Sequence, residues 1–373
     1  MSLLKFEFKK LWRSRLFVIF FLLSIGCVLG LFVRNYIYQD IIKAEKMSQF
    51  QQYSFNVQST VIVDTSDLYE IGEEGDPILE EEIEAGQALY SKLKELVTAI
   101  DENKELEALQ LENEAYQLAM DYIELDKYFP LTVEEMETEM TLNHELLHVG
   151  LPKEDLHTSI QPAVFSKQVV LLFFNSVGFF ILIVVVGLPI VKEFDDQTIK
   201  LTYGLPISST RMVLTKWLSM VISSVIWFTS VIGFALLISS WIGKSVDQPF
   251  YYPFDTRQAS FIQAGDYLQQ VIGYGLLYLM MLVTLFTFFT FLFKRSLLVQ
   301  CSLFSLFIMA EITISQGFIY QWFPWLYQKL NVAVTQTIAG SGLAVVTTIV
   351  CTIVMLFLSI MVSKRRGHYS YLN

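Results

Sequence analysis

The chain has 373 residues, of which 53% are hydrophobic and only 17% are charged, whereas a soluble domain typically carries about 25% charged residues. A transmembrane helix needs about 20 mostly apolar residues, and six blocks of the sequence reach or approach that length. These blocks exclude a soluble enzyme and a nucleic-acid-binding protein, and they are too continuous for the alternating strands of a membrane β-barrel. The sequence therefore predicts an all-α polytopic membrane protein, with transmembrane helices over 16–34, 168–191, 217–242, 268–293, 296–316 and 341–362.

The first predicted element, over 1–15, is an amphipathic helix. Its apolar side chains fall at the spacing of one helical face, and they are Leu4, Phe8, Leu11 and Trp12. The basic residues beside them suit anionic lipid headgroups. We therefore expect a cytosolic elbow helix that lies in the plane of the membrane and turns into the first span. Plain positively charged flanking sequence is the alternative interpretation.

The segment 35–167, between the first two spans, is predicted to be a large and mostly helical extracytoplasmic domain. It contains 29 acidic and 8 basic residues. Two runs of apolar and small residues at alternating spacings of three and four indicate packed helices, and their phase breaks near Asp101, Glu102 and Asn103. We therefore expect two antiparallel helices joined at these residues, and a loop over the acidic stretch 64–76.

One motif in this domain has the spacing of a zinc site. His144, Glu145 and His148 form H-E-x-x-H, which on a helix places both histidines on one face with the Glu as a general base. Catalytic zinc needs a third protein ligand, and Gly150 and His157 are out of register for the extended form of the motif. We therefore expect an ordinary solvated helix and no metal site here, with adventitious or structural metal binding as an alternative.

The distribution of basic residues predicts which loops face the cytosol, because Lys and Arg resist translocation. The segments 1–15, 192–216, 294–295 and 363–373 together contain 14 Lys and Arg residues against 4 Asp and Glu residues. They alternate with the acidic outer segment and with two shorter loops. We therefore expect a multi-pass protein of the cell membrane, with both termini in the cytosol.

The cytosolic loop 192–216 has the form of a docking element for a soluble partner. Acidic residues at its start suit a helix N-terminus, where the helix dipole favours negative charge. Pro206 ends that helix, and Ser208 or Ser209 can cap the next one. We therefore expect a short cytosolic helix over 193–206, in a loop too short to be an enzyme.

This loop resembles the corresponding loop in permease subunits of type 2 ABC exporters. In that family an acidic residue, a short polar helix, a Leu-Pro pair, a Ser, an Arg and a Lys that enters the next span recur. The matching segment contains Glu193, Phe194, Asp196, Thr198, Leu205, Pro206, Ser208, Arg211 and Lys216. Gln197 stands where the family usually has Gly. The resemblance covers the architecture of the whole chain, but sequence detail only at 1–34 and 187–220.

The resemblance implies a permease subunit that couples through these residues to a separate P-loop ATPase, which would hold ATP and Mg²⁺. It also implies a second permease chain, identical or related, in the same bilayer. Members with an enlarged outer domain often accompany peptide-antibiotic resistance or export systems, which implies export or extraction of a peptide or amphiphile and antimicrobial peptide resistance. The Gly-Lys-Ser at 243–245 lacks the first Gly of a P-loop. We therefore expect no ATP hydrolysis, no cofactor and no nucleic acid on this chain.

Glu311 is the one clear charged residue inside a predicted span, and a charge at bilayer depth costs at least about 2.5–3.5 kcal/mol. As a functional hypothesis, Glu311 lines the substrate path or pairs with Tyr274 or Tyr278 of the fourth span. A buried structural hydrogen bond is the alternative interpretation.

Two other functions stay open from the sequence. One is a membrane-anchored sensor or immunity protein that binds an extracellular ligand without transport. The other is an extracytoplasmic zinc metalloprotease that uses the motif at 144–148. An adjacent gene for a P-loop ATPase would favour the transporter over both.

Overall fold

The computed structural model describes residues 3–71, 76–203, 207–243, 247–256, 260–318, 322–338 and 342–369. Within these residues the fold is almost entirely helical, and six helices are long and apolar enough to cross a membrane. This confirms the predicted all-α architecture, with six candidate spans. A two-stranded sheet, which the sequence did not predict, joins two short strands.

The longer helices follow one another in chain order as α1 (Leu3–Arg13), α2 (Arg15–Ile71), α3 (Pro77–Asp101), α4 (Glu105–Glu124), α5 (Val133–Val149), α6 (Pro162–Phe173), α7 (Ser176–Asp195), α9 (Ser209–Ile242), α10 (Ala264–Phe293), α11 (Ser296–Ser315) and α13 (Gly342–Tyr369). The short elements are α8 (Ile199–Tyr203), η2 (Pro249–Tyr251), β1 (Pro253–Thr256), β2 (Ser260–Gln263), η3 (Pro324–Gln328), α12 (Leu330–Val332) and η4 (Ala333–Ile338). The six candidate spans are α2, α7, α9, α10, α11 and α13.

The chain divides into two compact units, which we describe separately. The first comprises 1–32, 162–244 and 254–373, and the second comprises 33–161 and 245–253. The predicted outer segment 35–167 differs from the second unit at its end, because α6 packs with α7, α9 and α10 and so belongs to the first. The piece 245–253 joins the second unit, in which the amide of Glu154 donates to the Tyr252 hydroxyl at 3.2 Å.

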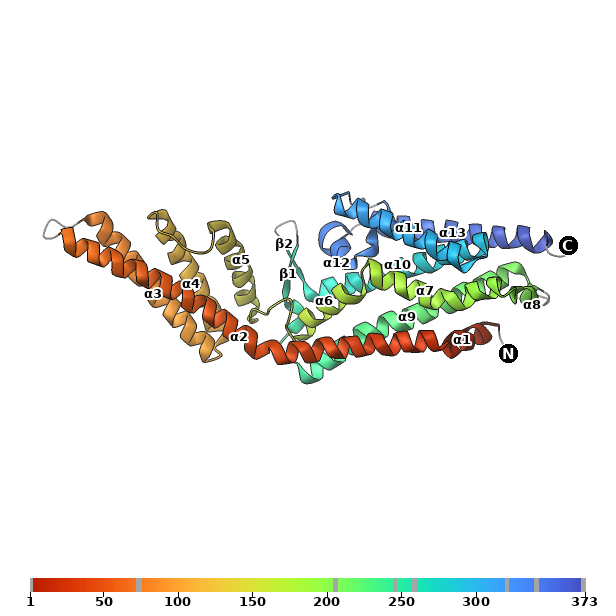
Figure 1. The fold of residues 1–373 in the computed structure, drawn as a ribbon, viewed down its shortest axis with the longest axis horizontal. Helices are drawn as coiled ribbons and strands as arrows, with labels where there is room; N and C mark the ends of the chain where they lie inside the picture. Colours follow the sequence, from red (N-terminus) through yellow and green to blue (C-terminus); the bar gives the residue numbers. More distant parts are fainter. Residues whose placement is uncertain are drawn as a thin grey trace. The chain divides into compact units, whose positions relative to one another are not determined.

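In the first unit α10 is central, because it contacts α7, α9, α11 and α13 (Figure 1). Its residues Met281 to Phe286 are all buried, as expected of a helix that is apolar on every side and surrounded by others. The packing of α10 on α7 is close, since a Cβ at Gly187 would lie 2.2 Å from the ring of Phe286. The buried rings of Trp227 and Phe228 on α9 extend this core.

The segment 168–191, predicted as the second span, does not form one uninterrupted helix. α6 and α7 are separate helices joined at Phe174 and Asn175. The Oδ1 atom of Asn175 accepts from two amides in the first turn of α7, and its Nδ2 donates to two carbonyls in the last turn of α6, at 2.9 to 3.1 Å. One side chain therefore bonds two backbone groups at each of the two helix ends, which makes a break more tolerable inside a membrane.

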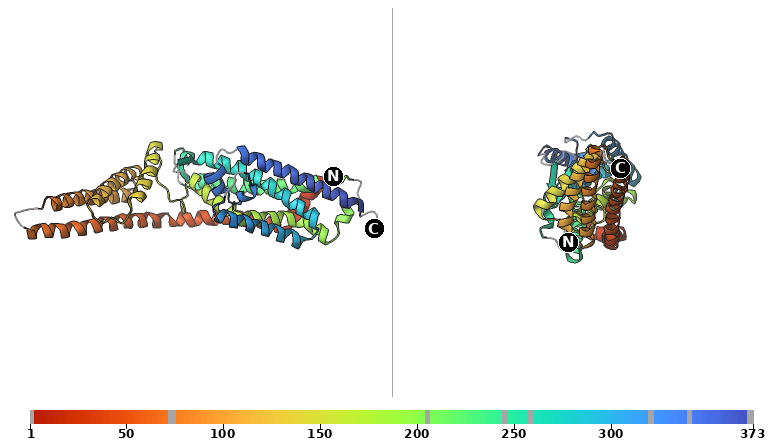
Figure 2. Two further views of the ribbon diagram at one scale, coloured as in Figure 1. Left: turned by 90° about the horizontal axis from the view of Figure 1, so that it is seen from above. Right: turned by 90° about the vertical axis from the view of Figure 1, so that its left-hand side faces the viewer.

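The second unit is a bundle of α3, α4 and α5 along the part of α2 that follows Phe32 (Figure 2). Its core contains Phe50 of α2, Leu93 of α3, Ala119 of α4 and Met136 of α5. The turn between α3 and α4 falls at the predicted phase break. There Asn103 has φ of 59°, a left-handed conformation that Asn adopts more readily than most residues.

α2 continues to Ile71, so the loop predicted over 64–76 is wrong for residues 64–71. The Ser and Asp residues that indicated a loop lie partly on the solvent side of this helix. Asp64 is buried instead, and its carboxylate pairs with Lys127 at 3.0 Å. The remaining loop residues 72–75 lie outside the described part of the chain.

A buried charged cluster ties α4 to its neighbours in the second unit. Glu112 is 1% exposed and pairs with Lys46 of α2 at 2.8 Å and with Lys153 at 2.5 Å. Asn143 of α5 donates to the same carboxylate at 3.3 Å. Burial by itself would raise the pKa of Glu112, but Lys153 and Lys46 outweigh it and lower the pKa to about 2.

Candidate functional site

The predicted docking loop begins inside a long helix. α7 extends to Asp195, so Glu193 and Phe194 belong to its last turn, and only α8 forms a separate short helix. The single helix expected over 193–206 is therefore wrong. Leu205 and Pro206 lie outside the residues that the structure describes.

Lys216, on the first part of α9, is held in a charged network. Its Nζ donates to Oε1 of Glu7 at 2.6 Å and to Oε2 of Glu193 at 2.7 Å. Lys10 pairs with Oε1 of Glu193 and donates to the carbonyl of Pro189 at 3.0 Å. The network therefore joins α1, the end of α7 and the start of α9.

The burial of this network makes each charge depend on its partners. Lys216 is 1% exposed and Glu7 is 4% exposed. A buried ion is expensive to remove from water, and removing one partner of a buried pair typically costs about 3–5 kcal/mol. Two cations and two carboxylates balance one another here, so none of the four can be lost without leaving a buried charge poorly compensated.

Glu193 and Asp195 lie at the C-terminal end of α7, where the helix dipole disfavours negative charge. This corrects the expectation that they begin a helix. The two lysines compensate Glu193. Asp195 accepts from the backbone amide of Ser296 at 3.1 Å, so its carboxylate lies at the N-terminus of another helix, α11.

An apolar cluster packs against the buried side of the segment formed by the end of α7, α8 and the start of α9. The ring of Phe194 packs edge-on against Phe291 of α10, with ring centres 5.3 Å apart. Ile199 of α8 and two residues of α9, Met212 and Val213, are buried in the same cluster. Through this cluster α8 is anchored to α7, α9 and α10.

The outer side of the segment is solvent-facing. Asp196, Thr198 and Arg211 are exposed, and Leu201 of α8 is 77% exposed although it is apolar. Ser208 caps α9 by accepting the amide of Arg211 at 3.3 Å. α8, α1 and the last turns of α13 lie at the same end of the first unit (Figure 1).

Glu311 lies near the end of α11, and its partners come from outside the fourth span. Ser176, the first residue of α7, donates to its Oε2 at 2.8 Å, and Gln328 of η3 donates to the same oxygen at 3.1 Å. Lys329 forms an ion pair with Oε1. The side chains of Glu311 and Lys329 are 40% and 36% exposed, so the pair is accessible.

The predicted tyrosine partners of Glu311 lie elsewhere on α10. Tyr278 is buried, and its ring packs edge-on against Phe179 at 5.0 Å. Tyr274 is half-buried. Within the described part of the chain, the carboxylate of Glu311 bonds to Ser176, Gln328 and Lys329, and to neither tyrosine.

A cavity of about 750 Å³ adjoins this polar group, between α2, α6, α7 and α11. Its walls are mainly apolar and include Phe20, Phe180 and Phe304, while Glu311 and Lys329 supply charge. This volume lies within the range of about 300–1,000 Å³ that is typical of ligand sites, as does the combination of apolar walls with a few polar groups.

The histidines of the H-E-x-x-H motif lie on α5 and are exposed, as is Glu145. Over the described ranges of the chain, no group of three or more His, Cys, Asp and Glu side chains is placed to hold a metal ion. The residues of α5 that face inward are Met136, Asn143 and Leu146.

A family described as ABC-2 family transporter protein matches residues 1–365 of the chain. The chain belongs to the ABC-2 transporter family. It is therefore a multi-pass permease of an ABC transporter, a membrane transport component that is not itself catalytic, and membership implies association with an ATP-binding subunit. No curated protein and no solved structure matches the chain.

Gln197, the departure from the resemblance noted above, lies in a turn of the permease and has φ of 58°. This left-handed conformation costs a non-glycine residue about 1–2 kcal/mol. Gln197 therefore takes, in the turn between α7 and α8, a backbone conformation that glycine would adopt at lower cost.

Several residues of the charged network around Lys216 and of the polar group around Glu311 were not predicted from the sequence. Glu7 is the only acidic residue in 1–15, and Lys329 is the only charged residue in 317–340. Each stands out against its surroundings, and this is the signal that could have found it. Leu201 carried no such signal, because its exposure depends on how α8 is anchored.

Proposed function

We propose that this permease couples to a separate P-loop ATPase through α8 and the coupling network, which we define as Glu7, Lys10, Glu193 and Lys216. ATP and Mg²⁺ belong to that ATPase. The permease pairs with a second permease chain and exports or extracts a peptide or other amphiphile.

The burial of Lys216 between two carboxylates is the observation that carries this proposal. Buried ion pairs have discrete arrangements, and packed elements respond to a push by switching rather than by deforming gradually. A displacement of α8 would act on α7 and α9 through Phe194 and Ile199. The network then passes it to α1, which leads into the first span.

The exposed side of the segment supplies the docking face. Leu201 offers an apolar side chain, and Asp196 and Arg211 offer charges of both signs beside it. An exposed apolar residue with charged neighbours suits a protein interface, in which a buried anchor is surrounded by polar contacts.

The proposal places α8, both termini and α1 on the cytosolic side of the membrane. The support is the excess of Lys and Arg in 1–15, 192–216, 294–295 and 363–373. α1 would lie in the plane of the membrane surface, and the second unit would lie outside the cell.

The cavity beside Glu311 is our candidate for the substrate path. Its apolar walls suit the apolar part of an amphiphile, and the accessible pair of Glu311 and Lys329 suits a polar group. The break between α6 and α7 lies at this cavity, and broken helices near the bilayer midplane form substrate sites in other transporters.

Co-purification of the ATPase with variant permeases tests the docking face. Leu201→Asp should abolish recovery of a P-loop ATPase with the full-length permease, because a charge replaces the apolar anchor. Leu106→Asp is the matched control, since Leu106 is also exposed but lies on α4 of the second unit. Undiminished recovery with Leu201→Asp would contradict the proposed docking face.

A further inference from the structure

A second cavity, of about 560 Å³, lies between α1 and the end of α7. Its lining combines apolar residues, Phe6, Leu16 and Leu188, with an unusual density of charge. Four cationic side chains line it against two acidic ones. The cationic residues are Lys9, Lys10, Arg13 and Lys192, and the acidic ones are Glu193 and Asp196.

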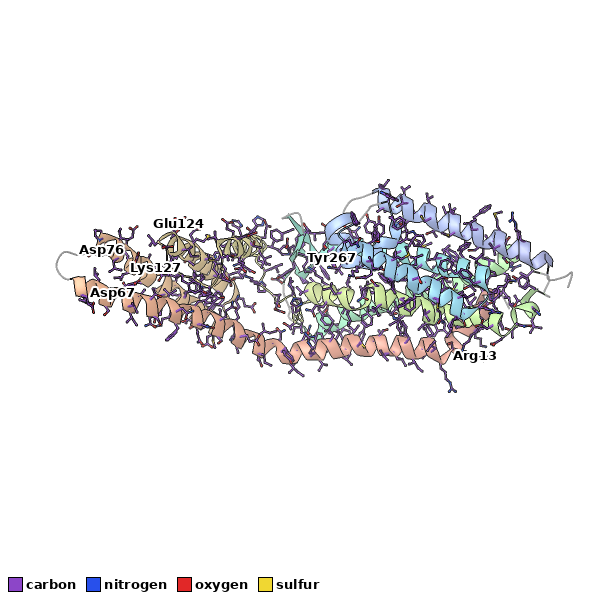
Figure 3. The ribbon with its side chains drawn as sticks, turned by 45° about the horizontal axis from the view of Figure 1, so that its top comes forward. Arg13, Asp67, Asp76, Glu124, Lys127 and Tyr267 are labelled. Atoms are coloured by element: carbon purple, nitrogen blue, oxygen red, sulfur yellow. The ribbon has the colours of Figure 1, made fainter. Side chains whose placement is uncertain are left out.

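Among the described residues, three of the four cations form no ion pair. Lys10 pairs with Glu193, but across the described ranges no acidic side chain forms an ion pair with Lys9, Arg13 or Lys192. The side chain of Arg13 extends away from the helices (Figure 3). Unpaired like charges around one cavity repel one another, and an anion in that cavity would relieve the repulsion.

The position of the cavity selects the kind of anion. Lys9 and Arg13 lie one turn apart on α1 and Leu16 lies in the first turn of α2, the first candidate span. The cavity therefore sits where a transmembrane helix begins, at the boundary between water and lipid. Phe6 and Leu16 are 57% and 42% exposed, so apolar surface adjoins the cationic groups.

We propose that this cavity binds the phosphate headgroup of an anionic phospholipid, with its acyl chain along Leu16 and Leu188. A juxtamembrane basic cluster gains about 1 kcal/mol per Lys or Arg from anionic lipid. The bound phosphate lies next to Lys10 and Glu193. The lipid therefore keeps α1 in contact with Glu193 and Lys216 of the coupling network. The stability of the network then depends on the lipid composition of the membrane.

The test measures lipid retained by the full-length permease in micelles that contain equal amounts of phosphatidylglycerol and phosphatidylcholine with the same acyl chains. The wild type should prefer phosphatidylglycerol. Each neutralising substitution, Lys9→Gln, Arg13→Gln or Lys192→Gln, should weaken that preference about fivefold, which corresponds to about 1 kcal/mol. Lys9→Arg, Arg13→Lys and Lys192→Arg together should preserve it, which separates loss of charge from loss of folding.

Arg295→Gln is the matched control, because Arg295 is exposed and lies outside the cavity. Retention of the preference after all three neutralisations would overturn the proposal, and so would an equal loss with Arg295→Gln. Displacement of phosphatidylglycerol by soluble glycerol phosphate would assign the cavity to a small anion instead of a lipid. The readout involves no ATPase, so it stands or falls independently of the docking face.

A separate observation concerns the outer face of α2 in the second unit. Residues 47–63 contain no charged side chain, although the segment 35–167 around them contains 29 acidic residues. Opposite the buried face of α2, large apolar residues recur every seven positions at Phe55, Ile62 and Tyr69, which are 66%, 62% and 83% exposed. Ser48, Gln52, Ser59 and Ser66 fill the intervening positions at alternating spacings of four and three. This is the spacing of a coiled-coil seam.

This inference rests on the proposed pairing of two permease chains and locates it: we infer that this seam pairs with the same seam of a second copy of the chain. Two acidic domains repel each other, and residues 47–63 of α2 give them an uncharged surface on which to meet. Interface cores are likewise depleted of charged residues. A seven-residue repeat that is identical in both copies lets two α2 helices pack in parallel, with small and polar residues allowing close approach.

Disulfide crosslinking in membranes tests the seam, because the second unit has no native cysteine. With the three native cysteines replaced by Ser, Phe55→Cys and Ile62→Cys should each form disulfide-linked dimers of the full chain. Leu106→Cys, exposed on α4, is the matched control and should stay monomeric. Absence of dimers at both seam positions, or equal crosslinking at the control, would overturn the inference.

Discussion

Replacing Lys216 by Met tests whether the coupling network is as costly to break as its burial suggests. Lys216 is 1% exposed and contacts two carboxylates at 2.6 and 2.7 Å. In Lys216→Met the carboxylates of Glu7 and Glu193 stay buried, and only Lys10 remains to compensate them. Removing one partner of a buried ion pair costs about 3–5 kcal/mol.

The assay is the thermal unfolding temperature of the full-length permease in detergent. With a shift of about 2–4 °C per kcal/mol for a large domain, the expected fall is roughly 6–20 °C. Lys200→Met, an exposed lysine on α8, should change little. Adding Glu7→Gln and Glu193→Gln to Lys216→Met should restore most of the loss, because the buried charges disappear. An unchanged unfolding temperature for Lys216→Met would refute the reasoning.

Three further outcomes follow from individual contacts. In thermal unfolding, Asp195→Ala should lower the stability of the permease by about 1 kcal/mol, because the first amide of α11 loses its acceptor. Asp196→Ala should not, because it leaves that bond intact. The pKa of Glu112 is lowered from its ordinary 4.5 to about 2. The ionised Glu112 therefore stabilises the fold above about pH 4.5, and this contribution is lost as the pH falls toward 2. Thermal unfolding followed by circular dichroism should show that Glu112→Gln is less stable than the wild type at neutral pH and loses less stability in acid. Glu311→Gln should reduce both export and stimulation of the ATPase, and unchanged values of both would remove Glu311 from the substrate path.

The sequence predicts most of the helical architecture because the physical signals are local. A continuous apolar run of suitable length marks each span. In the second unit, the change of phase near Asp101 marks the turn between α3 and α4, since a helical face cannot shift without a break in the helix. Residues Glu193 and Lys216 were predicted together through the family resemblance, and the structure brings their side chains into contact.

The features that escaped prediction depend on tertiary contacts. The partners Glu7 and Lys216 are far apart in the chain. The residues around either one do not indicate that the two side chains meet. The break between α6 and α7 lies within an apolar run, where Asn175 is the one local sign. The extension of α2 beyond residue 63 was not predicted, because Asp64 is typical of a loop in the sequence. Its ion pair with Lys127, which allows it to be buried in a helix, exists only in the folded bundle.

The segment with α8 and Arg211 is proposed to face the cytosol, where an ATPase can reach it. Labelling of single cysteines with a membrane-impermeant maleimide tests this most directly, in a chain whose three native cysteines are replaced by Ser. Arg211→Cys should react only after the cells are opened, whereas Asn103→Cys, in the turn between α3 and α4, should react in intact cells. Labelling of Arg211→Cys in intact cells would contradict the account.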